Sequence, residues 1–277
     1  MTSAELRAIT GSDIPEVSRY IARVFDTREA QVVRRLEWAE ATDPPNLGFL
    51  LRASVGVVGI FTATYSTTPS GHQVCHLGGW HVEEAYRAQS LALFRAFLKG
   101  PYDVFTDYTP VPHVRPINQR LGFVDLDTRS TRIWNARIPL RRRGIRLVSA
   151  PDEAAALLTG RDRKRFEDHR SVPDLHQLVL RDGDARCHVL YRRERGRTTR
   201  ARILYVSDIA LFRASASQVL FHILVKHRSL FTVAELRTIG GPIRFSRSAP
   251  AIARQVRTNG LPHSEAEYDY SSLIWVE

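Results

Sequence analysis

The chain has 277 residues, 43% of them hydrophobic and 25% charged, which is typical of a folded globular protein and excludes a disordered one. The longest apolar runs fall far short of the ~20 residues that a membrane-spanning helix needs, and the polar first residues lack the apolar core of a secretion signal. The net charge of +11 favours anionic ligands in general, but only three of the 40 basic residues are lysines, a bias that a GC-rich genome explains equally well.

Hydrophobic periodicity predicts the elements of the first half in chain order. A cap at Ser12–Asp13 and apolar residues at helical spacing predict a helix over residues 12–25, and a second helix over 28–41 ends at the breaker Asp43–Pro44–Pro45–Asn46. The predicted elements that follow are strands 47–53, 56–65 and 74–82, helix 88–98, strand 102–108, a short helix at 113–120 and a strand pair within 123–138.

The same order of elements begins again after Arg143, although the two halves share negligible residue identity. The predicted elements are strand 145–148, helical segments 151–158 and 162–168, a hairpin turning at Asp182–Gly183, strand 203–206, helix 212–227, strand 231–236, helix 250–258 and strand 268–276. This repeat predicts two domains, residues 1–143 and 144–277.

The segment Cys75–Ala92 combines a strand that ends at Val82 with a cation and small residues at the start of a helix. Arg87 supplies the cation, and Ala88, Ser90 and Ala92 are small. A helix N-terminus presents unpaired N–H groups and a positive dipole end, and small side chains let a phosphate approach them. An ordinary surface helix preceded by a solvated arginine is the alternative interpretation.

This segment resembles the GNAT acyltransferase family (GCN5-related N-acetyltransferases), in which a strand ending in valine leads into an Arg/Gln-x-x-Gly-x-Gly/Ala loop. Ser90 replaces the usual glycine. The segments Leu6–Val17 and Gln119–Phe123 resemble the family's first strand and helix and its Leu-Gly-Phe turn, so the resemblance covers about residues 5–137. It implies that acetyl-CoA or a longer acyl-CoA is the co-substrate, bound by Val82, Arg87, Ala88, Gln89, Ser90, Leu91 and Ala92.

Acyl transfer from a thioester needs a base for the acceptor, a donor for the oxyanion and an acid for the leaving thiolate. In several members of the family the base lies six residues before the terminal valine of the fourth strand, which is His76 here. Strand alternation predicts His76, Gly78, Trp80 and Val82 on one face. A histidine satisfied within the core is the alternative.

The family's frequent general acid is a tyrosine five residues before the phenylalanine of Leu-Gly-Phe, and Asn118 occupies that position. An asparagine can orient a group but cannot protonate a thiolate, so Tyr108 or water would have to replace the acid.

The remaining features have simpler explanations. The arginine-rich stretch 192–202 lies in a predicted hairpin and either contacts phosphates or is solvated. The ten histidines have no metal-ligand spacing, so no metal is expected. Cys75 and Cys187 are isolated, which excludes a disulfide framework and favours a cytoplasmic location.

The sequence therefore predicts an α/β protein of two GNAT-like halves, each a mixed, mostly antiparallel twisted sheet flanked by helices. The expected activity is transfer of an acyl group from acyl-CoA to an amine or hydroxyl of a small, polar or anionic acceptor. The second half, in which Val206–Phe212 lacks the arginine and small-residue loop, is expected to be degenerate and either structural or part of the acceptor side. A non-catalytic module that binds acyl-CoA or an anionic polymer is the alternative; nucleic-acid binding rests on charge alone.

Overall fold

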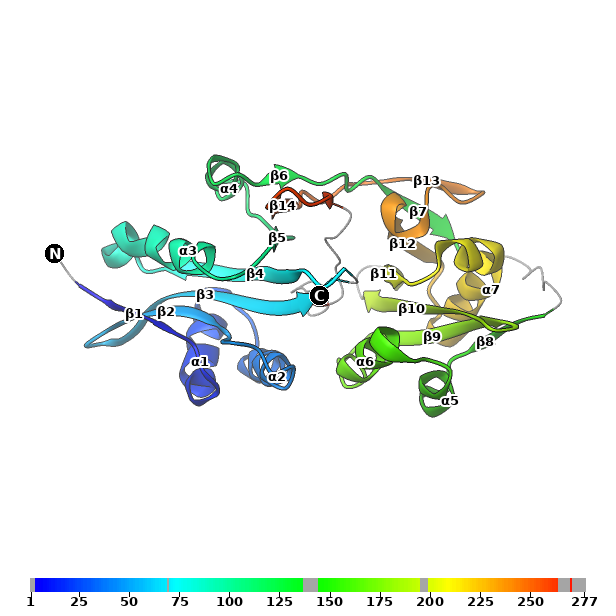
Figure 1. The fold of residues 1–277 in the computed structure, drawn as a ribbon, viewed down its shortest axis with the longest axis horizontal. Coiled ribbons are helices and arrows are strands. Elements are labelled where there is room, and N and C mark those ends of the chain that lie inside the picture. The colour runs from blue at the N-terminus through cyan, green and yellow to red at the C-terminus, as the bar shows by residue number, and fades with distance from the viewer. Residues whose placement is uncertain (1–2, 69, 137–143, 195–198, 264–269, 271–277) are drawn as a thin grey trace. The chain divides into compact units, whose positions relative to one another are not determined.

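The computed structural model of the chain consists of two compact units. The first comprises residues 1–126 together with a returning segment that begins at Arg254, and the second comprises residues 127–253. The structure describes residues 3–68, 70–136, 144–194, 199–263 and 270 (Figure 1).

The first unit is built on a seven-stranded sheet with the order β1-β2-β3-β4-β5-β14-β6. Its strands are β1 (Glu5–Ala8), β2 (Gly48–Ala53), β3 (Gly56–Thr67), β4 (Gln73–Val82), β5 (Val104–Asp107), β6 (Val124–Asp125) and β14 (Gln255–Thr258). Only β4 and β5 pair in parallel among these described strands. The sheet is therefore mixed and mostly antiparallel, as predicted.

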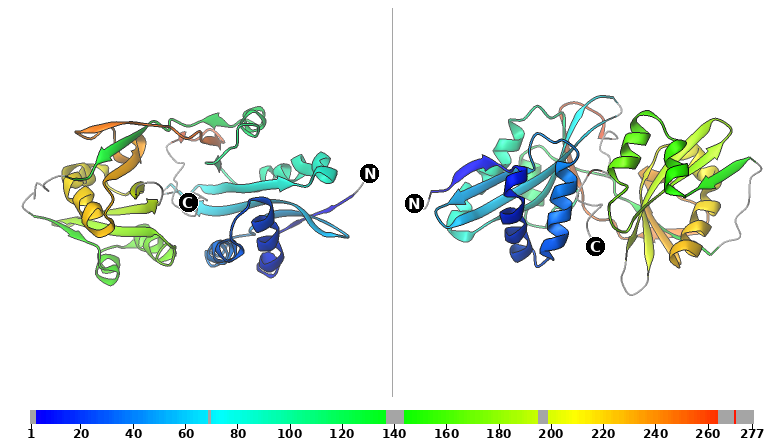
Figure 2. Two further views of the ribbon diagram at one scale, coloured as in Figure 1. Left: turned by 180° about the vertical axis from the view of Figure 1, so that it is seen from behind. Right: turned by 90° about the horizontal axis from the view of Figure 1, so that it is seen from below.

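Helices cover both faces of this sheet (Figures 1 and 2). They are the 3₁₀ turn η1 (Gly11–Asp13), α1 (Ile14–Val24), α2 (Glu29–Glu40), the 3₁₀ helix η2 (Glu84–Gln89), α3 (Ser90–Leu98) and α4 (Arg115–Arg120). The buried face of α1 carries Ile14, Val17 and Ile21, which the predicted helical spacing requires. On the opposite face, Phe94 and Phe97 of α3 pack against Phe61 of β3.

The second unit repeats this plan in a sheet with the order β13-β7-β12-β11-β10-β9-β8. Its elements are β7 (Ser130–Trp134), β8 (Ile145–Val148), α5 (Pro151–Ala156), α6 (Gly160–Asp168), β9 (Leu175–Asp182), β10 (Ala185–Glu194), β11 (Arg200–Val206), α7 (Ile209–His227), β12 (Phe231–Glu235), α8 (Leu236–Ile239) and β13 (Ser246–Ala249). The predicted hairpin at Asp182–Gly183 is confirmed, since β9 and β10 pair on either side of it.

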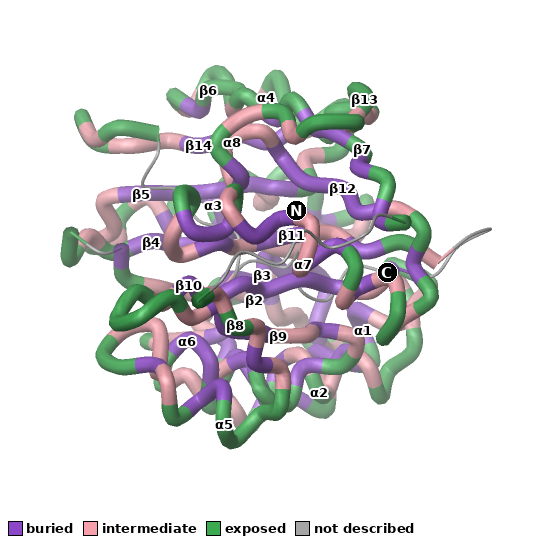
Figure 3. Tube along the Cα trace, turned by 90° about the vertical axis from the view of Figure 1, so that its right-hand side faces the viewer, coloured by how far each residue is buried: buried purple, intermediate pink, exposed green. Residues whose placement is uncertain are grey.

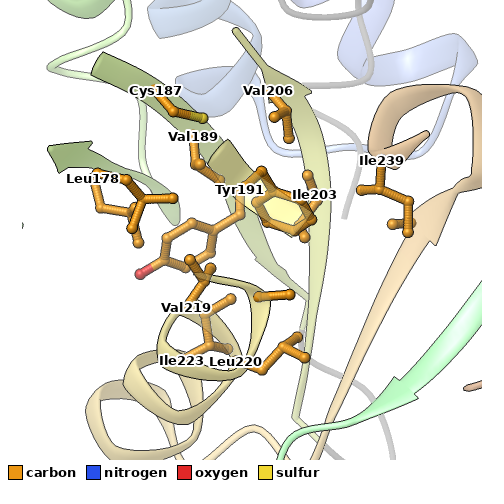
Figure 4. Packing of buried hydrophobic residues seen from close by; sticks show 14 of the residues in the cluster. Leu178, Cys187, Val189, Tyr191, Ile203, Val206, Val219, Leu220, Ile223 and Ile239 are labelled. Atoms are coloured by element: carbon orange, nitrogen blue, oxygen red, sulfur yellow. The ribbon is translucent and has the colours of Figure 1, made fainter. Parts of the chain in front are cut away.

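The hydrophobic core of the second unit lies between its sheet and α7 (Figure 4). Val189 and Tyr191 of β10 face Val219 and Ile223 of the helix, and all four are fully buried. The central strands of the sheets are the most deeply buried parts of the chain (Figure 3). By length and hydropathy the 19 residues of α7 would suffice to span a membrane, but its buried residues are those that form this core.

The two halves of the sequence exchange one strand each, so the units do not coincide with the predicted division after residue 143. β7, from the first half of the sequence, pairs with β12 and β13 of the second unit, whereas β14, from near the C-terminus, pairs with β5 and β6 of the first. The chain leaves the first unit after Leu126 and returns at Arg254. A division by sequence halves misses this because each exchanged strand finds its hydrogen-bonding partners in the other half.

Two predicted elements near the C-terminus also need comment. The predicted helix 250–258 is wrong, because β14 occupies Gln255–Thr258 and pairs with the edge of β5. The predicted strand 268–276 lies outside the described residues, except for Tyr270.

Candidate functional site

Near the centre of the first sheet, the parallel strands β4 and β5 are paired only over the first part of β4. Pairing between β4 and β5 runs from Val74–Val104 to Leu77–Asp107, where β5 ends. β4 continues for five more residues to Val82, and among the described strands only β3 pairs with this extension. The edge of β4 that faced β5 therefore offers backbone groups to a ligand from Gly78 onward.

A β-bulge lies at the start of this extension. Phe61 pairs with Trp80 and Ala63 with Leu77, so that Thr62 of β3 faces both Gly78 and Gly79 of β4. The Thr62 hydroxyl accepts a hydrogen bond from the Gly79 N–H at 2.9 Å. A side chain at Gly78 would collide with Thr62, because a β-carbon there would lie 2.5 Å from Oγ1. The glycines thus permit the close approach that the bulge requires.

The bulge reverses the alternation of side chains, so the predicted face of His76, Gly78, Trp80 and Val82 is wrong. Trp80 stacks on Phe61 with ring centroids 4.9 Å apart and joins Val82 in the core beneath α3. His81 points to the other face, where its Nδ1 lies 2.9 Å from the hydroxyl of Tyr20 in α1. The inserted residue accounts for this shift by one position.

On the α1 and α2 side of the bulge lies Arg35. Its Nη2 is 3.0 Å from the position of a β-carbon on Gly78. Arg35 is half-buried, and burial lowers its pKa to about 10. Phe25, which is 44% exposed, lies beside Gly79, where a β-carbon would be 3.2 Å from its ring. A cation and an aromatic ring thus border this face of the bulge.

His81 is the imidazole on the extended part of β4. Burial lowers the pKa of its ring; Glu83 opposes this effect, whereas Arg23 and Arg87 add to it, so the neutral form is favoured. Among the described residues only Tyr20 hydrogen-bonds to it, through Nδ1. When Nδ1 donates to the tyrosine oxygen, Nε2 carries the free lone pair that a general base needs.

His76, the residue predicted as base, lies within the paired part of β4. It is 2% exposed. Its Nε2 is 2.8 Å from the Ser66 hydroxyl and its Nδ1 is 2.9 Å from the Thr106 hydroxyl. Both ring nitrogens therefore have hydroxyl partners, which is the geometry of a satisfied core histidine.

Asn118 lies in a buried polar network at the end of β5. Its Nδ2 donates to Asp107 Oδ2 at 2.8 Å and to Gln255 Oε1 at 2.9 Å, so the exchanged strand β14 completes the network. Burial raises the pKa of Asp107 to about 6, against the opposing hydrogen bonds from Asn118 and the Thr109 N–H. The Asp107 carboxyl group is therefore partly protonated near neutral pH.

Tyr108 follows Asp107 in sequence but is 1% exposed. It packs with Val74, Val104 and Val256, and its ring centroid lies 6.1 Å from that of His76. Tyr108 and His76 are thus brought together by the fold, but inside the packed part of the sheet rather than along the extension of β4.

The predicted phosphate-binding turn is more helical than the sequence indicates. Residues 84–89 form the 3₁₀ helix η2, which continues directly into α3. The N–H of Ser90 donates to the Arg87 carbonyl, and Arg87 is exposed and pairs with Glu84 at 2.9 Å. Ala88, Leu91 and Ala92 are exposed, and Gln89 and Ser90 half-buried. The side chains around the start of α3 are therefore accessible, but the Ser90 N–H is already bonded to the Arg87 carbonyl and Glu84 competes for the arginine.

The equivalent helix start in the second unit is already occupied. The carboxylate of Asp208 caps α7 by accepting a hydrogen bond from the Leu211 N–H at 2.9 Å. Leu211 and Phe212 are buried. The carboxylate of Asp208 thus bonds an N–H group that a phosphate would need, while Leu211 and Phe212 belong to the core.

Part of the arginine-rich stretch is paired within its hairpin, while residues 195–198 lie outside the described residues. Glu194, which is buried, accepts from Arg200 Nε at 2.6 Å and Arg202 Nε at 2.5 Å. Among the described residues no group of histidine, cysteine and carboxylate side chains has the arrangement of a metal site, and both cysteines are buried free thiols.

Sequence reasoning singled out neither Arg35 nor the bulge. The pair Gly78–Gly79 within a predicted strand was the available signal, because glycine in a strand interior often marks a bulge. No sequence motif distinguishes Arg35 from Arg34, the other arginine of α2.

No family model and no curated protein matches the sequence, but solved structures share its fold. A GCN5-related N-acetyltransferase from Anabaena variabilis matches 92% of this chain and 72% of its own, with a TM-score of 0.64 and 11% identity. Eis1 from Mycobacterium abscessus matches 92% and 73%, with a TM-score of 0.57 and 16% identity. A putative acetyltransferase from Pyrococcus horikoshii matches 98% and 93%, with a TM-score of 0.56 and 15% identity.

These matches confirm the predicted fold: the chain consists of two units with the fold of the GCN5-related N-acetyltransferases.

Proposed function

We propose that the protein transfers an acyl group from acyl-CoA, acetyl-CoA or a longer thioester, to an amine or hydroxyl acceptor, and that the first unit binds the thioester. The observation that carries this proposal is the extension of β4 past the end of β5, with the bulge at Gly78–Gly79 and α3 directly beyond Val82. The unpaired backbone groups along the extension can hydrogen-bond to the amides of the pantetheine arm of coenzyme A. The start of α3 can bind its phosphates.

An unpaired donor supports ligand binding at this extension. Trp80 Nε1 is buried and has no hydrogen-bond partner among the described residues. A buried donor without a partner costs free energy, so native proteins rarely keep one unless a ligand or water satisfies it. The indole lies on the same five residues of β4 that lack a strand partner on one edge.

The chemistry assigns separate groups to the two proton transfers. His81 takes the proton of the acceptor through Nε2 as its nitrogen or oxygen attacks the thioester carbonyl. Asp107, in its protonated form, returns a proton to the thiolate that leaves when the tetrahedral intermediate collapses. Environments that push two pKa values in opposite directions from their ordinary values are typical of an acid–base pair. His76 is the competing candidate for the base.

Reversing the charge of Arg87 tests the phosphate site. Because Arg87 is exposed and already paired with Glu84, we expect Arg87→Glu to weaken coenzyme A binding by about 1 kcal/mol, or roughly fivefold, when measured by isothermal titration calorimetry.

Arg95→Glu is the matched control for this variant, because Arg95 is an exposed arginine in the last turn of α3, the helix that follows η2. It changes the net charge equally and should leave coenzyme A affinity within about twofold. If both variants lost the same coenzyme A affinity, the overall positive charge of the protein, and not Arg87 in particular, would account for the effect.

Coenzyme A should bind with a stoichiometry of one per chain. Asp208 and the buried Leu211 and Phe212 occupy the start of α7 in the second unit, so a second phosphate site is not expected there. The same titration measures this number, and two equivalent sites would contradict the assignment of the second unit as structural or acceptor-side.

A module that binds acyl-CoA without turnover is the second candidate, and Asn118 favours it because its amide cannot protonate a thiolate. Steady-state assays with acetyl-CoA and longer acyl-CoA over amines and alcohols separate the two functions. We also propose a cytoplasmic location, because both cysteines are free thiols, as is usual in a reducing compartment.

A further inference from the structure

Arg35 is half-buried and yet has no anionic partner among the described residues. Arg23 pairs with Glu83 at 2.7 Å and Arg115 with Asp125 at 2.6 Å. Arg35 forms no hydrogen bond or ion pair with any residue that the structure describes. A half-buried guanidinium costs free energy when nothing compensates its charge, so its retention at this position calls for a ligand.

The position of Arg35 connects it to the proposed reaction. Its Nη2 lies 3.0 Å from where a β-carbon on Gly78 would be, at the point where the pairing of β4 with β5 ends. Thr62 contacts the same glycine and holds the bulge through the Gly79 N–H. An anion bound to Arg35 would therefore lie within a few bonds' length of the bulge.

The geometry of the arginine side chain indicates which kind of anion Arg35 would bind. The planar guanidinium presents parallel N–H donors that match the two oxygens of a carboxylate. Because the guanidinium lies next to the bulge, the anionic group and the attacking atom of the acceptor must be close together in the acceptor molecule. An amine with a carboxylate on the same or the next carbon meets this requirement, and the exposed ring of Phe25 provides an apolar contact for its side chain.

We propose that Arg35 binds the carboxylate of the acceptor, so that the acceptor class is amino acids. This inference rests on the proposed acyl transfer, because it places the amine at the thioester. Arg35 orients the acceptor and takes no part in proton transfer, since its guanidinium stays protonated throughout.

The test uses the full chain and measures binding separately from turnover. Thermal shift and calorimetry are carried out with each of the twenty amino acids and with the corresponding amines that lack the carboxylate, such as phenylalanine against phenethylamine. At least one amino acid should bind ~10-fold or more tightly than its decarboxylated partner.

Three variants locate the effect. Arg35→Met should abolish the preference for the carboxylate, and Arg35→Lys should restore only part of it, because an ammonium keeps the charge but not the fork of donors. Arg34→Met, which alters an exposed neighbour on the same helix, should preserve the preference. Circular dichroism establishes that each variant is folded.

The outcomes separate this inference from the proposed function. If coenzyme A binds but no amino acid does, or if Arg35→Met keeps the preference, the acceptor assignment is overturned and the acyltransferase proposal stands. If amino acids bind through Arg35 but neither coenzyme A binding nor acyl transfer is detected, the carboxylate site stands and the acyltransferase proposal falls.

Discussion

Replacing His81 by alanine is expected to lower kcat about 100-fold with little change in coenzyme A affinity, because a positioned general base contributes roughly that factor. The ring lies on the extension of β4, and its Nε2 has no hydrogen-bond partner among the described residues. A Tyr20→Phe variant should have a smaller effect, since Tyr20 only orients the ring through Nδ1.

His76→Ala decides between the two imidazoles. His76 holds the hydroxyls of Ser66 and Thr106 in the interior of the sheet, so its loss should lower the melting temperature while the folded fraction keeps its kcat. Steady-state turnover is measured with saturating acetyl-CoA, at a temperature about 20 °C below the melting temperature of each variant. A 100-fold fall for His76→Ala and none for His81→Ala would return the role of base to His76.

Acidification is expected to destabilise the second unit between about pH 6.5 and pH 4. His176 of β9 and His227 of α7 lie with ring centroids 4.1 Å apart, and burial, with help from Lys226, lowers the pKa of each to about 4. Both rings are therefore neutral in the folded state, whereas the unfolded chain protonates them below its ordinary value of ~6.5.

The sign of the effect follows from this difference. Because the folded pKa is depressed, the stabilisation is fully present above pH 6.5, falls as the unfolded chain takes up protons, and is lost by about pH 4. Proton uptake by the unfolded chain should cost on the order of 3 kcal/mol of unfolding free energy over this range. In this pair of tilted rings, His176 Nε2 is buried and has no hydrogen-bond partner among the described residues, so no acceptor there stabilises a charged ring.

Urea unfolding of the full chain at pH 7.5 and pH 4.5 measures this loss. His176→Phe keeps a ring in the core but cannot be protonated, so the loss between the two pH values should shrink markedly. His113→Phe, at an exposed position of the first unit, is the control and should leave it unchanged. Equal pH dependence in both variants would show that other groups govern the acid transition.

The sequence could determine the elements whose signals are local. The helical spacing of Ile14, Val17 and Ile21 matches the buried face of α1, and Asp182–Gly183 marked the turn between β9 and β10. These signals suffice because helix faces and tight turns depend on residues within a few positions of one another. The order of such elements, together with the motif from Val82 to Ala92, was enough to predict the fold.

Contacts between distant residues decided the rest. Nothing near Gln255–Thr258 indicates a strand, and that segment is extended because β5 and β6 provide hydrogen-bonding partners on either side. In the same way, pairing with β12 and β13 makes β7 part of the second sheet. In such cases the need to pair buried backbone groups outweighs the local secondary-structure propensity of the segment.

The candidate site shows the same division. The sequence identified β4 as the strand that carries the chemistry, since its residue types lie close together in the chain. Which of its side chains share a face depended on the bulge opposite Thr62, and the presence of Arg35 beside it depended on the packing of α2. A single inserted residue exchanges the two faces of a strand, so only the tertiary structure shows that Trp80 and Val82 lie on the face opposite His76. Pairing with β5 then distinguishes His76, within the paired part of β4, from His81 on the extension.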